Sequence, residues 1–134
     1  MALKLEIVTP EARIYSETVD LVTLPGIEGE MGIFPNHVAL MTQVVAGEVI
    51  VKRGSQSQHL AVGDGFVEIT GDRVAILTDM AMKSDDIDET KAEEARKRAE
   101  ARLQEKLSDE ETASVTAALA HSLAQLKVKR RHRG

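Results

Sequence analysis

The segment GIEGEMGIFPNHV, which runs from Gly26 to Val38, brings glycines, carboxylates, a proline and a histidine together in a short stretch. Closely spaced glycines can cradle a phosphate, paired carboxylates can share acid–base work, and a histidine can bind a metal. Glu28 and Glu30 are two residues apart, so they would share a face if both lay on one strand. The segment therefore raises three hypotheses: a phosphate loop, a carboxylate pair and a metal site.

Motif spacing disfavours all three hypotheses. A phosphate loop of the G-x-x-x-x-G-K-[ST] type needs a lysine that this segment lacks, and G-x-G-x-x-G is missing as well. The histidines show none of the short ligand spacings of a zinc site, and after the acidic run DDIDET, Lys91 stands where a calcium loop needs glycine. No nucleophile accompanies the two carboxylates. We therefore expect no catalytic residue and no metal site.

Composition narrows the function further. Aromatic residues make up 2% of the chain, so stacking platforms for nucleic-acid bases are nearly absent, and we expect no nucleic-acid binding despite KRRHR at 129–133. The absence of cysteine excludes disulfides and thiol chemistry and fits a reducing compartment. No stretch approaches the roughly 18 apolar residues of a membrane span. The opening MALKLEIVTP alternates like a strand and lacks the apolar run of a signal peptide.

The elements that position these side chains fall into two halves. From residue 3 to residue 79, short segments alternate apolar and polar side chains, and Gly, Pro and Asn separate them. In the first segment Leu3, Leu5 and Ile7 share one face. Many short strands with closely spaced turns predict an antiparallel sandwich or barrel.

After Lys83 the sequence changes character. Ala, Glu, Lys, Arg and Leu dominate, there is no proline, and no glycine occurs until the last residue. This composition predicts two helices, over 87–107 and 109–128, joined as an antiparallel hairpin.

Two pairs of residues suggest where these helices begin. Asp86 and Glu89 are spaced as an N-cap residue and its reciprocal partner, and Ser108 and Glu111 repeat the pattern as an S-x-x-E capping box. Both pairs therefore predict helix starts next to them.

The apolar faces of the predicted helices are thin. Their members are Ala92, Ala95, Ala99, Leu103 and Leu107 on the first helix and Val115, Leu119, Leu123 and Leu126 on the second. Alanine lets helices approach closely but buries little area. A hairpin held this lightly should be able to leave its resting position; the alternative is a hairpin that stays docked permanently.

Charge is also sorted along the chain. Residues 1–84 and 85–111 are both net acidic, whereas KVKRRHRG at 127–134 has only basic charges. A cationic end on an acidic molecule suggests docking to an acidic surface. The alternative is a solvated helix end whose cations complement the helix dipole. A β domain with a light helical hairpin and a basic end favours an adaptor or regulator over an enzyme.

Four segments resemble one known family. EGEMGIFPNHVAL at 28–40 closely resembles the signature of epsilon subunits of rotary ATP synthases, roughly G-E-[LM]-G-I-[LFY]-P-x-H. LKLEIVTPEARIYSETVDLVTLPG at 3–26 is similar to the first strands of that family. VGDGFVEITGDRVAIL at 62–77 is similar to a later hairpin, with Asp64 in place of a common glycine. DDIDETKAEEARKRAEARL at 85–103 resembles the start of its C-terminal helices, so the resemblance covers essentially the whole chain.

The resemblance implies an α+β fold. A flattened antiparallel β-sandwich of about ten short strands would cover residues 1–84, and a two-helix hairpin would cover 85–134. Family members are non-catalytic parts of the central stalk, whose β domain grips the gamma subunit and stands on the ring of c subunits. By position, Glu28 and Glu30 would face the c-ring and His37 would lie near gamma.

In bacteria and chloroplasts the helical hairpin of this family also acts as a brake. The resemblance implies that the folded hairpin permits turnover, whereas the extended hairpin reaches the alpha and beta subunits and blocks ATP hydrolysis. Basic residues would then lie against an acidic segment of beta. The matching residues in this chain are Lys127, Lys129, Arg130, Arg131 and Arg133.

Some family members bind ATP at the folded hairpin through an [IL]-D-x-x-R-A motif. The matching residues here are Ile87, Asp88, Lys91 and Ala92. Lys91 keeps the charge of the motif arginine but not its planar fork, and Arg98 would supply a second cation. His121, Ser122 and Gln125 stand where ATP-binding members tend to place arginines. We therefore expect no required cofactor and only weak regulatory binding of ATP.

The resemblance also implies a location. The chain would be a peripheral subunit of a proton-translocating ATP synthase at the cytoplasmic face of the bacterial plasma membrane, and it would contact the membrane only through the complex. The alternative is an unrelated small intracellular adaptor of the same architecture that binds an acidic protein surface.

Overall fold

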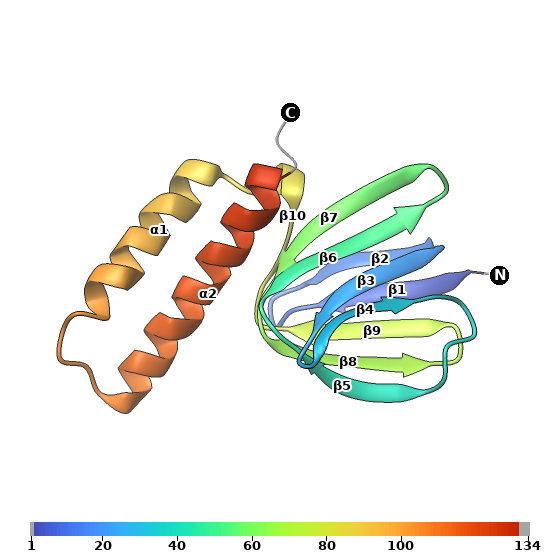
Figure 1. The fold of residues 1–134 in the computed structure, drawn as a ribbon, viewed down its shortest axis with the longest axis horizontal. Helices are drawn as coiled ribbons and strands as arrows, with labels where there is room; N and C mark the ends of the chain where they lie inside the picture. Colours follow the sequence, from blue (N-terminus) through green and yellow to red (C-terminus); the bar gives the residue numbers. More distant parts are fainter. Residues whose placement is uncertain (1, 132–134) are drawn as a thin grey trace.

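The computed structural model describes residues 2–131, which form a β domain followed by a helical hairpin (Figure 1). The strands are β1 (Leu3–Val8), β2 (Arg13–Val19), β3 (Leu21–Gly26), β4 (Gly29–Ile33), β5 (Leu40–Val44), β6 (Gly47–Arg53), β7 (Gln56–Val62), β8 (Gly65–Thr70), β9 (Arg73–Thr78) and β10 (Ala81–Lys83). The helices are the short 3-10 helix η1 (Ser84–Asp86) and the α-helices α1 (Glu89–Arg102) and α2 (Asp109–Arg131). The predicted sandwich followed by two helices is confirmed.

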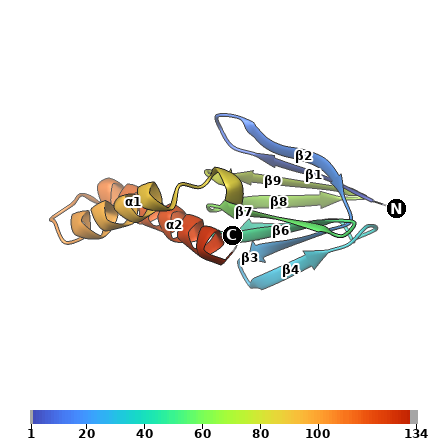
Figure 2. The same cartoon turned by 90° about the horizontal axis from the view of Figure 1, so that it is seen from above.

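The strands form two facing layers (Figure 2). Hydrogen bonding runs in the order β10-β7-β6-β3-β5-β8-β9-β1-β2, with β4 beside β3, and the Gly26–Val44 pair joins β3 to β5. Pairing is antiparallel except between β1 and β9, which run parallel. No tight turn connects those two strands, so their relative direction is free, whereas hairpin neighbours must be antiparallel.

The core lies between the two layers. Leu3, Leu5 and Ile7 are all 0% exposed, as the alternation of this segment predicts. The inward residues of the other strands join them, and nearly all of these are aliphatic. With so few aromatic residues, the sandwich depends on many small and medium side chains at close packing density.

Glycines shape the hairpin between β3 and β4. Gly26 pairs with Gly29, and Ile27 and Glu28 form the turn between them. Gly29 has a φ of 127°, a conformation that suits glycine. Glu28 therefore lies in the turn and Glu30 on β4, so the expectation that the two carboxylates share a strand face is wrong.

Gly65 lies where the backbone of β9 comes close to β8. A Cβ at this position would lie 1.9 Å from the carbonyl oxygen of Leu77, a backbone atom that cannot move aside. We expect Gly65→Ala to lower the free energy of unfolding by about 2–3 kcal/mol, and the Tm by about 5 °C or more. Chemical denaturation and thermal melting measure both. Gly32→Ala is the matched control because a Cβ there meets its nearest atom only at 4.0 Å; equal losses in the two variants would contradict this packing.

Helix α1 begins later than the sequence pattern predicts. Asp88 is its N-cap, and the Asp88 carboxylate accepts a hydrogen bond from the backbone N–H of Lys91 at 3.0 Å. The prediction that Asp86 is the N-cap is wrong, because Asp86 ends η1. Ile87 explains the shift: it is 4% exposed and extended, with ψ of 125°. Burying this side chain against the β domain keeps the chain out of helical conformation until Glu89.

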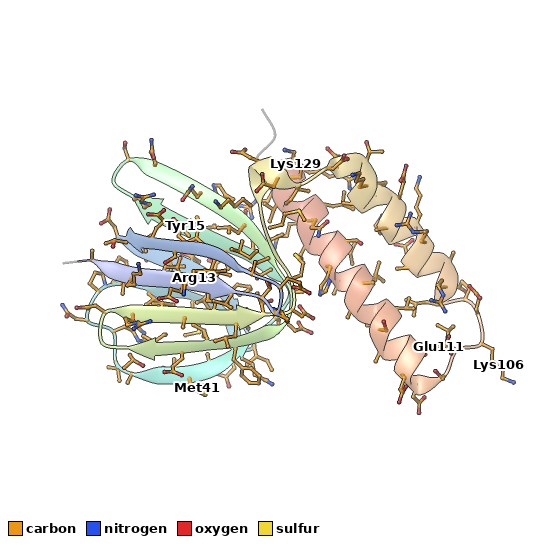
Figure 3. The ribbon with its side chains drawn as sticks, turned by 180° about the vertical axis from the view of Figure 1, so that it is seen from behind. Arg13, Tyr15, Met41, Lys106, Glu111 and Lys129 are labelled. Atoms are coloured by element: carbon orange, nitrogen blue, oxygen red, sulfur yellow. The ribbon has the colours of Figure 1, made fainter. Side chains whose placement is uncertain are left out.

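The connection between the helices is longer than predicted. Helix α1 ends at Arg102, and residues 103–108 lead into α2. The predicted end at residue 107 left too little chain for the reversal of direction. The capping box is confirmed: the Glu111 N–H donates to Ser108 Oγ at 3.1 Å, and the Ser108 N–H donates to the Glu111 carboxylate at 3.3 Å. Lys106 and Glu111 mark this end of the hairpin in Figure 3.

Helix α2 lies between α1 and the sandwich (Figure 1). It packs through a small apolar cluster that joins it to β7 and to the segment before α1; its buried members are Ala61, Ile87, Ala124 and Val128. Leu123 is 48% exposed, so its predicted place on the packed face is wrong. Met80 and Met82 pack against this cluster, and its few buried members fit the expectation of light packing.

Candidate functional site

The predicted contact residues of the β domain do not form one cluster. Glu28 and Glu30 lie at the β3–β4 turn, on the side of the sandwich that faces the hairpin (Figure 1). His37 lies beyond the other end of β4, in the connection to β5. The contact residues predicted from the sequence therefore lie on two separate surfaces rather than in one site.

The connection around His37 is held by local hydrogen bonds. His37 Nδ1 lies 2.6 Å from the Val38 carbonyl oxygen, and the Asn36 N–H donates to the Asp72 carboxylate at 3.0 Å. Asn36 has a φ of 66°, which Asn tolerates better than most residues. This arrangement presents Phe34 and Val38, which are 62% and 80% exposed. The loop is thus an ordered apolar projection.

A second apolar surface covers the outer side of β5, β8 and β9. Gln43, Phe66 and Leu77 are cross-strand neighbours, and the two apolar side chains are 52% and 54% exposed. Met41, on the outer side of β5, is 65% exposed (Figure 3). We call Met41, Phe66 and Leu77 the apolar face. Sequence reasoning missed it, although consecutive apolar residues in GFVEI and VAILT break the strand alternation there.

Two hollows flank the apolar face. One, of about 320 Å³, lies between Ile27, Val45 and Phe66. The other, of about 440 Å³, lies beside Leu77 and is lined by Val8 and Pro10. Asp64 lines both hollows, and Asp79 also lines the second. The surface is suited to receiving the apolar side chains of a partner.

The basic end of α2 is ordered and makes contacts within the chain. Helix α2 runs to Arg131, three residues past the predicted end, and basic residues in its last turn complement the helix dipole. Arg130 donates to Glu89 and Glu93 on α1 at 2.8 and 2.9 Å. Arg131 donates to Glu48 on β6 at 2.7 Å. Predicted Arg133 lies outside the described residues.

Two further tail cations differ in their surroundings. Lys129 donates to the Ser84 carbonyl oxygen at 3.2 Å (Figure 3). Lys127 is exposed and, with Arg131, lines a hollow of about 300 Å³ whose other wall includes Glu30 and Glu48. The structure therefore brings together two groups that the sequence treated separately, the acidic β3–β4 hairpin and the basic tail.

Ion pairs between the helices strengthen this end of the hairpin. Hydrogen bonds from Arg96, and then from Arg130, lower the pKa of Glu93 to about 2. The same pairs raise the pKa of Arg130, chiefly through Glu89. Hydrogen bonds from the Ser108 backbone and hydroxyl lower the pKa of Glu111 at the opposite end. These groups keep their charges throughout the physiological pH range.

The residues of the predicted nucleotide motif have structural tasks. Ile87 and Ala92 are buried in packing contacts, and the carboxylate of Asp88 caps α1. Lys91 is exposed, and Arg98 lies seven residues further along the helix, roughly 10 Å away. The structure therefore does not gather Lys91 and Arg98 into a compact phosphate site. Nucleotide binding at these residues stays a prediction.

Besides the Arg131–Glu48 pair, a second polar contact between the hairpin and the sandwich was not foreseen. His121 Nε2 lies 3.0 Å from the Asp79 carboxylate. The pair packs directly over Gly63, where a Cβ would meet both side chains at 2.8 Å or less. Sequence alone could not pair residues so far apart; only the glycine between two strands hinted at close approach.

Within residues 2–131, no helix is both long enough and apolar enough to cross a membrane. Across the same residues, no group of three or more His, Asp or Glu side chains is placed to hold a metal ion.

Comparison with known proteins gives consistent matches over both halves. The family described as ATP synthase, Delta/Epsilon chain, beta-sandwich domain matches residues 2–84, and its long alpha-helix domain matches residues 85–130. An ATP synthase epsilon chain of Dehalococcoides mccartyi is 46% identical over 98% of this chain and 94% of its own length. One of Herpetosiphon aurantiacus is 40% identical over 99% and 98%.

A solved structure is similar in fold. A chain in the mitochondrial ATP synthase of Euglena gracilis, in a structure of OSCP, F1 and c-ring, aligns with a TM-score of 0.77 at 24% identity, covering 98% of this chain and 82% of that one. At this identity the likeness concerns the fold.

Proposed function

Because the chain belongs to the ATP synthase delta/epsilon family, we propose that it is a non-catalytic central-stalk subunit of a proton-translocating ATP synthase. It couples rotation of the gamma subunit to the c-ring and inhibits ATP hydrolysis through its C-terminal helices. Family membership favours this role over that of an unrelated adaptor with the same architecture. As a peripheral subunit it lies at the cytoplasmic face of the bacterial plasma membrane, held there by the complex.

The apolar face is the observation that carries the contact with gamma. Met41, Phe66 and Leu77 each expose more than half of their surface on a regular sheet, and exposed apolar patches of this kind mark protein interfaces. The projecting loop with His37 supplies a second contact to gamma. Glu28 and Glu30, on the glycine-shaped turn, meet the c-ring. A sheet and a tight turn transmit torque because neither deforms easily.

The basic tail supplies the brake. In the docked hairpin Arg130 and Arg131 face carboxylates of their own chain. When the hairpin extends, these residues and their neighbours Lys127 and Lys129 meet an acidic segment of the beta subunit. Several partly screened ion pairs are enough to shift a two-state equilibrium.

Co-purification tests the stalk assignment. Full-length chain carrying an affinity tag should retain co-expressed gamma through washing, whereas a tagged fragment of residues 85–134 should not. The tagged full-length chain alone should show no ATP turnover. Retention of gamma by the helical fragment would place gamma binding in the helices rather than in the sandwich. No retention by the full-length chain would refute the stalk assignment.

A further inference from the structure

The cations at the end of α2 each attach to a different part of the chain. Arg130 joins two carboxylates of α1, Glu89 and Glu93. Lys129 reaches the Ser84 carbonyl oxygen in η1, and Arg131 reaches Glu48 on β6. The docked hairpin therefore places its basic end against acceptors from the sandwich, the linker and the first helix together.

Glu48 differs from the other acceptors in its burial. Its side chain is 5% exposed, compared with 30% for Glu89 and 24% for Glu93. One Glu48 carboxylate oxygen accepts from Arg131, and the other lies 3.2 Å from His59 Nδ1. Removing one partner from a buried carboxylate costs more than breaking an exposed ion pair, because the carboxylate is not fully resolvated. Breaking the Arg131–Glu48 contact therefore opposes lifting of the end of α2.

From this geometry we infer that Glu48, Glu89, Glu93 and the Ser84 carbonyl form an internal latch for the basic tail. The latch holds the hairpin down and occupies the same cations that an acidic partner needs. Each guanidinium can serve only one of the two surfaces at a time, so the internal carboxylates compete with the external ones. The part of this inference that concerns hydrolysis rests on the proposed function; the latch itself does not.

The competition has a consequence for substitutions. Neutralising Glu48 weakens only the docked state, because Glu48 stays with the sandwich when the hairpin lifts. Neutralising Arg131 weakens the docked state and also the contact with the acidic partner. Both substitutions should therefore weaken docking, and neutralising Arg131 should deepen inhibition less than neutralising Glu48 does.

Docking is measured on the isolated full-length chain. The native sequence has no cysteine, so Ser55→Cys in the exposed β6–β7 turn and Ser114→Cys on exposed α2 place spin labels on the two domains without interference. Distance distributions then give the ratio of undocked to docked molecules. Glu48→Gln and Arg131→Gln should each raise this ratio by about three- to tenfold, and the double variant should raise it little further.

The matched controls are Glu94→Gln and Lys97→Gln. Both residues are exposed on α1, and among residues 2–131 neither has an ion-pair partner. The controls should leave the distribution unchanged. Because Arg131 is 54% exposed at a helix end, its substitution cannot disturb the sandwich core, so it tests the contact even if Glu48→Gln destabilises the fold. Unchanged distances in Arg131→Gln would overturn the latch.

The rate of ATP hydrolysis by the assembled complex distinguishes the internal latch from the inhibitory role of the tail. Glu48→Gln should deepen inhibition about threefold. Arg131→Gln should deepen it less, or leave it unchanged, because this substitution also removes a contact with the acidic partner. If the distances shift while hydrolysis stays the same in both variants, the latch is supported and the inhibitory role is wrong. If hydrolysis responds but the distances do not, the latch is overturned and the inhibitory role remains.

Discussion

Truncation of the chain after Leu107 is expected to raise the rate of ATP hydrolysis by the assembled complex about two- to tenfold, in proportion to the population of the extended hairpin. The truncation removes α2, and with it every basic residue of the tail and the contacts to Glu48, Ser84 and Asp79. The sandwich keeps all its strands and the apolar face. A steady-state assay with ATP regeneration measures the rate.

The truncated chain should still assemble and couple. The cut uncovers a few apolar side chains of the interdomain cluster, namely Ala61, Ile87, Met80 and Met82. A patch of this size is common on soluble proteins, so aggregation is not expected to obscure the result. Vesicles carrying the truncated subunit should therefore synthesise ATP under a proton gradient at the normal rate. Unchanged hydrolysis would leave the hairpin without an inhibitory role. Loss of coupling would mean that the hairpin, rather than the sandwich alone, transmits torque.

The parts of the fold that follow from short-range patterns were predictable. The alternation of the first strand places Leu3, Leu5 and Ile7 inward because side chains of a strand point to opposite faces in turn. The Ser108–Glu111 box predicts its two hydrogen bonds because an N-cap and the third helical residue are always adjacent in space. Such features depend on neighbours a few residues away, which the sequence displays directly.

The start of α1 was not predictable in this way. Asp86 and Asp88 are both good N-cap residues, and local propensity does not choose between them. The choice is made by Ile87, whose burial beside Ala61 and Val128 holds the intervening backbone extended. That contact joins three distant segments, so it becomes visible only after the hairpin has been docked on the sandwich.

The candidate sites also differ in whether short-range sequence patterns reveal them. The basic tail and the Glu28–Glu30 turn were visible as charge and glycine patterns. Glu48 gave no signal, because its partner Arg131 is 83 residues away along the chain. The apolar face did leave a trace, since Phe66 and Leu77 each lie beside an inward apolar residue and so break the alternation. Apolar residues on both sides of a strand were therefore a usable signal of an exposed apolar surface.

Phe66→Asp is the second change with a large expected effect: we expect it to lower the affinity for gamma at least about tenfold. Phe66 stands at the centre of the apolar face, between Gln43 and Leu77 on neighbouring strands. Aromatic residues at the centre of an interface typically contribute about 2 kcal/mol or more, and a buried aspartate adds the cost of an unpaired charge. Co-purification with tagged chain, or titration of purified gamma, measures the loss.

The fold should survive this substitution, because Phe66 points away from the core and is already 52% exposed. Thr18→Asp is the matched control: it places the same charge on an exposed strand position, on β2, away from the apolar face. The control should bind gamma as the native chain does. Equal losses in both variants would mean that added negative charge, rather than the apolar face, governs the interaction. Normal binding by Phe66→Asp would move the gamma contact elsewhere, with the His37 loop as the remaining apolar surface to test.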